Sequence, residues 1–342
     1  MSTRKQRLIV TDLEPDDKAV LLWYAREGVR CDVVVGHGDV KVKMQWMQAF
    51  MESVPELTQG WRVFPGVSTP FDPDDTFPAP PETKETVECG EFDPKQFEDL
   101  VRSHTVVISI KPHLEFLTLP AGVTFPDQRL YATMSFNLRA TVEVTHGKNA
   151  PLDAITQNAK RIIEMFPNFF AWIESFPALG QSGKNTGSFT FKNPVIRSLQ
   201  LQWNTTLLRD SLQRIKKKAA QLGYAEDIEL ETLNEELKAK ESSLTDEQEI
   251  RLVAGLLRTI KACLQIKSEV ETNNLIVDPL VVAIETRPDL FPLTPVEYKG
   301  HNVQGYPVLE KVESANLYMF QGDPETTGPL LAKYVTDKML EM

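Results

Sequence analysis

The sequence predicts an α/β protein built on an open, mostly parallel sheet with helices on its faces. Strand-like apolar runs and helical stretches alternate from the N-terminus, beginning with "RLIV", "DDKAVLLWYAREG" and "CDVVVGHGD". The joints between them are short, which favours parallel strands connected by helices on both faces. A composition of 42% hydrophobic and 25% charged residues over 342 positions is that of a folded chain with a large core.

The elements that follow continue this alternation. Residues 71–83, "FDPDDTFPAPPET", interrupt it because they are rich in Pro and Asp, so we expect a surface loop there. We expect helices at "VKMQWMQAFMESV", "FEDLVRSH" and "DAITQNAKRIIEMF", and strands at "TVVISI", "RLYATMSF" and "FFAWIESF".

Residues 205–270 differ in character, being charged and helical throughout. A break is expected around residues 223–227, and "SLTDEQE" indicates a helix start with Ser243 or Thr245 as its cap. We interpret this stretch as a helical insertion, an antiparallel hairpin, within a single domain of residues 1–342. After it, "NLIVDPLVVAIETRPDLF" returns to the core, strands are expected over 296–320, and "TTGPLLAKYVTDKML" is expected to be a helix.

Charge and hydropathy exclude several classes of function. The net charge of -11 argues against a nucleic-acid binder, which needs clustered Lys and Arg. No apolar stretch approaches the roughly 20 residues of a membrane helix, and "MSTRKQRLIV" lacks the apolar core of a secretory signal. The three cysteines show no spacing typical of disulfides or zinc. We therefore expect a cytoplasmic protein that binds a small molecule or a cation.

Four carboxylates, Asp12, Glu14, Asp16 and Asp17, crowd between the first strand and the first helix. Like charges this close repel, so either a divalent cation lies among them or they form a solvated turn that caps the helix. Asp278, in "IVDPLVVAI", is a distant acid with the same two interpretations, ligand or helix cap. Several carboxylate oxygens together suit calcium or magnesium.

The quoted motifs are similar to those of a known family. "VTDLEPDDKAVLL" resembles the N-terminal signature of the nucleoside hydrolases, the inosine-uridine-preferring N-ribohydrolases, and "IVDPLVVAI" resembles their C-terminal signature. "VVVGHGDV" and, more weakly, "ISIKPHLEFLTL" are similar to segments between them. The resemblance covers most of the chain outside residues 205–270. It implies a Rossmann-like fold, calcium-dependent hydrolysis of the N-glycosidic bond of a nucleoside or related ribosyl compound, and a homo-oligomer.

The resemblance also implies roles for particular residues. Asp12 would be a metal ligand and the general base, and the remaining ligands would be Asp17, Asp278 and the main-chain carbonyl of Leu114. Asp16 would lie at the ribose hydroxyls. The further candidates for contacts with the ribose or the base are Asp39, Asn137, Glu174 and Asn185.

One departure from the family pattern bears on activity. Val277 stands where the family has a His that is proposed to protonate the leaving base, and Val cannot transfer a proton. His37 and His113 lie beside matched motifs and are the candidates to replace it. The alternative is a catalytically weak or inactive binding or structural protein. A third hypothesis is a magnesium-dependent phosphotransfer fold. Such folds use a nucleophilic Asp and a partner Asp two residues later, whereas the residue two positions after Asp12 is Glu14.

Overall fold

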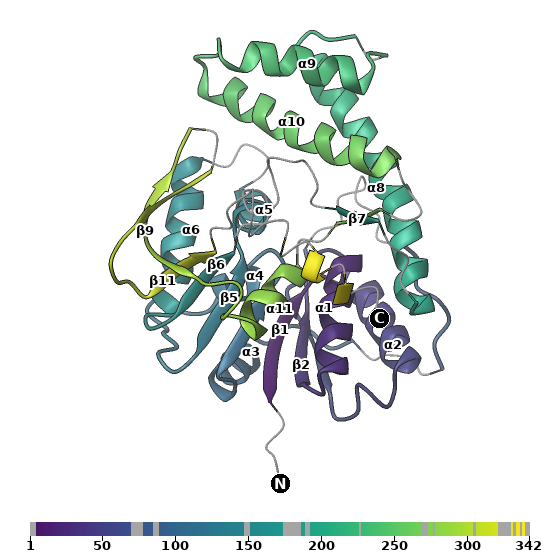
Figure 1. Ribbon diagram of the computed structural model, residues 1–342, viewed down its shortest axis with the longest axis vertical. Helices are drawn as coiled ribbons and strands as arrows, with labels where there is room; N and C mark the ends of the chain where they lie inside the picture. The colour runs from purple at the N-terminus through teal and green to yellow at the C-terminus, as the bar shows by residue number, and fades with distance from the viewer. Residues whose placement is uncertain are drawn as a thin grey trace.

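The computed structural model contains the expected sheet, nine-stranded and flanked by helices on both faces (Figure 1). From edge to edge the strands are β10 (Pro307–Lys311), β9 (Thr294–His301), β11 (Leu317–Phe320), β6 (Phe170–Ile173), β5 (Arg129–Thr133), β4 (Val106–Ser109), β1 (Gln6–Thr11), β2 (Arg30–Val35) and β3 (Arg62–Pro65). The structure describes residues 5–69, 78–84, 89–146, 151–173, 186–188, 192–225, 227–268, 273–275, 278–303, 306–320, 330, 333–335 and 337–338.

Across the sheet, every neighbouring pair of strands from β3 at one edge as far as β11 is parallel. β9 and β10 then add an antiparallel edge. A small antiparallel pair, β7 (Thr186–Ser188) with β8 (Asn273–Leu275), forms a separate sheet. The predicted fold class, an open and mostly parallel sheet, is therefore confirmed.

Two layers of helices cover the sheet because alternate residues of each strand point to opposite faces. Ile9 packs on one face with α1 (Pro15–Arg26), α2 (Val40–Ser53) and α11 (Pro279–Thr286). Leu8 and Val10 pack on the other face. The helices of that second layer are α3 (Pro94–Ser103), α4 (Leu114–Thr118), α5 (Ser135–His146) and α6 (Leu152–Met165).

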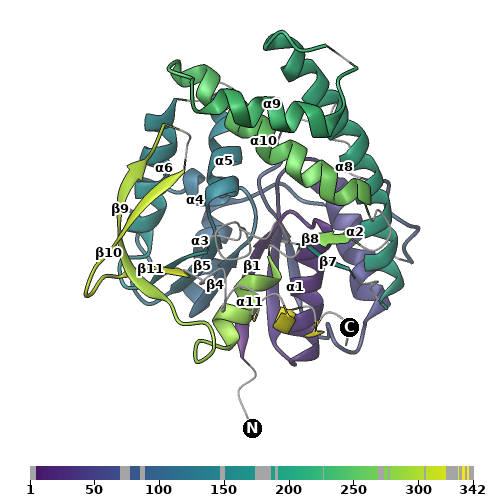
Figure 2. The same ribbon diagram turned by 45° about the horizontal axis from the view of Figure 1, so that its top comes forward.

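A helical arm of α8 (Pro194–Gln221), α9 (Leu230–Glu241) and α10 (Glu247–Ser268) contains most of the stretch expected to be an insertion. It has an apolar core of its own, which includes Leu233, Leu237 and Ile260. Figures 1 and 2 show the arm beyond the carboxyl ends of the parallel strands, with α8 rising alongside α2. The arm has three helices, where the sequence predicted a hairpin of two.

Other differences from the expected elements are local. Residues 135–137, expected to end a strand, instead begin α5, because β5 ends at Thr133. The cap of α10 is Asp246, which accepts a hydrogen bond from the amide of Glu249 at 2.9 Å, so the expected caps Ser243 and Thr245 were wrong. Residues 71–77 of the expected loop and most of the expected C-terminal helix lie outside the described residues.

None of the described helices combines the length and the apolar character that crossing a bilayer requires.

Candidate metal centre

The carboxyl end of β1 carries the first part of the acidic cluster. Asp12 follows the strand directly and is 5% exposed, so it does not lie in a solvated turn. Leu13 then adopts a left-handed backbone conformation, with φ of 60°, which is uncommon for a residue with a Cβ. This turn leads straight into α1, where Pro15 opens the helix and Asp16 and Asp17 occupy its first turn.

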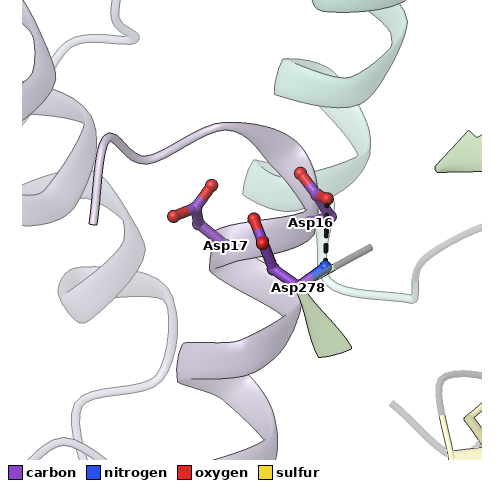
Figure 3. A group of neighbouring side chains, drawn as sticks. All are labelled: Asp16, Asp17 and Asp278. Carbon is purple, nitrogen blue, oxygen red and sulfur yellow. Dashed lines mark hydrogen bonds between the residues drawn. The ribbon is translucent and has the colours of Figure 1, made fainter. Parts of the chain in front are cut away.

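Asp278 joins this cluster from the other end of the chain. It is the residue before α11, yet its side chain makes no capping hydrogen bond with the described helix. Its backbone amide donates to Oδ2 of Asp16 at 3.5 Å. One carboxylate oxygen from each of Asp16, Asp17 and Asp278 lies within 4.8 Å of the other two, and Figure 3 shows the three side chains gathered at the start of α1. The cap interpretation of Asp278 therefore does not account for its carboxylate.

Asp17 is held in place on one side and unsatisfied on the other. The hydroxyl of Thr11 donates to Oδ1 of Asp17 at 2.5 Å, which fixes the rotamer. Oδ2 is buried and accepts no hydrogen bond from any residue that the structure describes. A buried carboxylate oxygen without a partner is costly. This oxygen therefore fits the position of a ligand to a cation.

Burial and mutual repulsion raise the pKa of the clustered carboxyls. Desolvation is the largest cause for each of Asp12, Glu14, Asp17 and Asp278. The neighbouring carboxylates add to it for Asp17 and Asp278, whereas Lys43 and Lys111 oppose it at Asp12. A divalent cation would remove this penalty by favouring the ionised forms.

Three buried lysines surround the same cluster. Lys18 is fully buried, donates to the carbonyl of Leu13 at 3.0 Å and lies 5.2 Å from the centre of the Trp46 ring. Burial holds the pKa of Lys18 well below its usual range. Lys43 and Lys111 are also buried, and part of the negative charge is therefore balanced by the protein itself.

The remaining predicted residues are placed as follows. Asp39 is exposed and caps α2, accepting a hydrogen bond from the amide of Val42 at 3.1 Å. Asn137, in the first turn of α5, donates to Oγ1 and to the carbonyl of Thr133 at 2.8 and 3.1 Å. Leu114 is buried at the start of α4, which follows β4. Glu174, Asn185 and Val277 lie outside the described residues.

The two histidines expected near the centre are poor proton donors at neutral pH. Burial and the neighbouring lysines lower the pKa of His37 and of His113 to about 3. Both rings are thus neutral at pH 7. The δ1 nitrogen of His113 lies 2.8 Å from the hydroxyl of Ser109, and Nε2 is buried with no partner among the described residues.

The sequence analysis did not identify the buried lysines or Glu115. Lys111 forms a fully buried ion pair with Glu115, both contacts being 2.6 Å. The available signal was a charged residue placed directly after the apolar run "ISI". Composition cannot distinguish such a residue from a solvated one that ends a strand.

Comparisons with known proteins add limited information. No family model matches the sequence, and no curated protein matches it either. Among solved structures, the chain is similar to an inosine-guanosine nucleoside hydrolase (IG-NH), with 10% identical residues, 99% of each chain covered and a TM-score of 0.48. At that identity and TM-score, the likeness establishes neither a family nor an activity for this chain.

Proposed function

We propose that this chain binds calcium at the acidic cluster and hydrolyses the N-glycosidic bond of a nucleoside or related ribosyl compound. The observation that carries the proposal is the meeting of Asp16, Asp17 and Asp278 within 4.8 Å, from segments about 260 residues apart. They meet where ligands bind in parallel α/β sheets, at the carboxyl ends of the strands. The motif resemblance described above supports the ribosyl substrate.

The donor set suits a hard divalent cation. Calcium takes six to eight oxygen ligands, often from carboxylates and main-chain carbonyls. The carboxylates of Asp17 and Asp278, with Asp12 and the carbonyl of Leu114, are the ligands that we propose. Asp16 lies as close to Asp17 and Asp278 as a ligand would, so we assign it to the cation or to the ribose hydroxyls beside it.

In the proposed reaction, water attacks the anomeric carbon while the bond from that carbon to the base nitrogen breaks. A bound cation would hold the ribose hydroxyls and supply positive charge beside the reacting carbon. Asp12 takes the proton from the attacking water. Its carboxylate is buried at the carboxyl end of β1 beside the proposed cation, and in its ionised form it can accept this proton. The leaving nitrogen takes the electron pair of the broken bond and needs a proton unless it is already stable.

That proton has no assigned donor among the described residues. His37 and His113 are neutral at pH 7, and the resemblance puts Val277 at the family's acid position. We therefore expect faster turnover of ribosides with good leaving groups than of unmodified nucleosides.

The second candidate is a calcium- or ribose-binding protein without turnover. The lack of an assigned proton donor among the described residues favours it, because His37 and His113 are both held neutral and an unactivated base then leaves slowly. Calcium and ribose binding without hydrolysis of any riboside would support this candidate over the enzyme.

Hydrolysis of an activated O-riboside tests the proposed attack of water at the anomeric carbon, and release of free base from nucleosides tests the N-glycosidic bond itself. With calcium present, the protein is expected to release p-nitrophenol from p-nitrophenyl riboside, and Asp12→Asn is expected to slow this by at least about 100-fold, the usual contribution of a general base. Asp289→Asn is the matched control, because Asp289 is exposed and lies beyond the end of α11 that is opposite to Asp278. Unchanged activity in Asp12→Asn would contradict the mechanism.

The resemblance and the composition also support finer expectations. We propose that the protein is a homo-oligomer and works in the cytoplasm, and that residues 1–342 form one domain with residues 205–270 inserted in it. Analytical ultracentrifugation of the full chain tests the oligomeric state.

A further inference from the structure

Three buried polar side chains meet at the end of the fold opposite to the acidic cluster. Nη2 of Arg7 donates to Oε1 of Glu285 at 2.7 Å, and the hydroxyl of Tyr24 donates to Oε2 of Glu285 at 3.2 Å. The side chains of Arg7 and Glu285 are 10% and 7% exposed, and Tyr24 is fully buried. We call Arg7, Tyr24 and Glu285 the basal triad.

Each member of the basal triad lies on an element that contains or directly adjoins a member of the acidic cluster. Arg7 lies on β1, which ends just before Asp12, and Tyr24 lies on α1, whose first turn carries Asp16 and Asp17. Glu285 lies near the end of α11, which Asp278 precedes. Seven residues of helix span roughly 10 Å, so the triad ties α1 and α11 about two turns from their acidic ends.

The packing between α1 and α11 is largely apolar. The residues of α1 and α11 contribute to one apolar core, in which Val20, Val281 and Ile284 are buried. Hydrophobic contacts are non-directional, whereas hydrogen bonds to a carboxylate fix distance and orientation. Repulsion among carboxylates within 4.8 Å tends to separate α1 from α11, and the hydrogen bond from Tyr24 to Glu285 links those helices at their other end.

We propose that Arg7, Tyr24 and Glu285 are positioning residues for the metal centre, holding β1, α1 and α11 in the register that keeps the acidic cluster assembled. This inference rests on the proposed function, since it assigns the triad a role in the affinity of the same site. None of the three side chains is itself a proposed ligand of the cation. It acts by reducing the reorganisation that the carboxylates need when a cation binds.

Calcium titration of Glu285→Gln tests the inference, because the amide keeps the shape of the side chain and removes its charge. With all proteins shown to be folded by circular dichroism, we expect Glu285→Gln to bind calcium about tenfold more weakly than the unaltered chain, the usual scale for losing an outer support of a metal site. The luminescence lifetime of bound terbium is expected to report more water on the ion in this variant.

Asp32→Asn is the matched control. Asp32 lies on β2, is buried, and accepts a hydrogen bond from Nε of Arg62 at 2.9 Å, so its replacement also removes an ion pair of a buried carboxylate near the same end of the sheet. It belongs to none of the three elements that carry the cluster. The calcium affinity and terbium lifetime of Asp32→Asn are expected to match those of the unaltered chain. If weaker binding in Glu285→Gln came only from a general loss of stability, Asp32→Asn would show it too.

The outcomes separate the inference from the proposed function. Calcium binding that is equally tight in Glu285→Gln, or equally weakened in Asp32→Asn, would overturn the positioning role and leave the metal centre standing. No calcium binding by the unaltered chain would overturn the metal centre and the inference with it. Tyr24→Phe, which removes one hydroxyl, carries the same test if Glu285→Gln does not fold, with a smaller loss of affinity expected.

Discussion

At the scale of single residues, the ends of the strands are held by a buried ion pair. Glu115 accepts two contacts from Lys111 and a hydrogen bond from the amide of Val67 at 2.8 Å, which ties β4 to the loop after β3. A Cβ on Gly36 would lie 2.2 Å from the Glu115 carboxylate, and one on Gly66 would lie 2.4 Å from it. The two glycines therefore leave the space that this pair fills beside the acidic cluster.

Removing one partner of the pair is expected to be costly. Lys111→Met leaves the carboxylate of Glu115 buried without its cation, so we expect the free energy of unfolding in urea to fall by about 3–5 kcal/mol. The double variant Lys111→Met with Glu115→Leu is expected to recover most of that loss, because no charge is left buried. A single variant that loses less than about 1 kcal/mol would show that the pair is not desolvated as the structure indicates.

A second buried carboxylate, Asp32, makes stability depend on pH. Burial acts to raise its pKa, but hydrogen bonds with His104 and Arg62 outweigh burial and lower the pKa to about 2. A depressed carboxyl pKa adds stability above the ordinary value of 3.8, and this stability is lost as the pH falls toward 2.

Asp32→Asn is therefore expected to lose about 1–2 kcal/mol at pH 7, a figure reduced for the exposure of Arg62. The difference in unfolding free energy between Asp32→Asn and the unaltered chain is expected to narrow below about pH 4. At that pH the Asp32 carboxyl of the unaltered chain takes up a proton in the unfolded state. Urea denaturation between pH 7 and pH 3 measures this. A gap of constant size across that range would contradict the assignment of the low pKa to Asp32.

At the scale of elements, the sequence predicted the parallel strands well because their residues are buried on both faces. Apart from Gln6 and Arg30, each the first residue of its strand, every residue of β1, β2 and β4 is buried, which only a sheet covered by helices on both sides accommodates. Helix α5 was missed. Its first residues, Ser135 and Asn137, have no strong helical signal, and tertiary contacts such as the bond from Asn137 to Thr133 determine where the helix begins.

The attachment of the helical arm gives an element-scale prediction. Oδ1 of Asn193 caps α8 by accepting from the amides of Val195 and Ile196 at 3.0 and 3.1 Å, and its Nδ2 donates to Ser53 of α2 at 3.0 Å. Asn193→Ala removes the cap and the link to α2, so we expect a loss of about 1–2 kcal/mol in unfolding free energy. Limited proteolysis is expected to cut the arm sooner.

Asn234→Ala provides the comparison, because Asn234 lies within α9 and its amide donates to Glu235 of the same helix. It is expected to change neither quantity. Equal stability of Asn193→Ala and Asn234→Ala would contradict the role of Asn193 as the anchor of the arm.

At the scale of the whole molecule, the candidate centre was predictable in part. The motifs named Asp17 and Asp278 as partners although they lie far apart in the sequence, and the structure brings them together with Asp16. The lysines around the cluster were not predictable, because the burial of Lys18 and Lys43 depends on how α1 and α2 pack against the sheet. The engagement of Asp39 as a cap and of Asn137 with Thr133 likewise follows from local geometry that the motifs do not specify.

Calorimetric titration of the EDTA-treated protein with calcium, beside the variant Asp278→Asn, tests the central claim most directly. We expect the unaltered chain to bind one calcium ion saturably. Asp278→Asn is expected to bind calcium at least about tenfold more weakly. Asp39→Asn is expected to bind calcium as the unaltered chain does. Absence of binding, or equal affinity in Asp278→Asn, would contradict a metal centre at Asp16, Asp17 and Asp278.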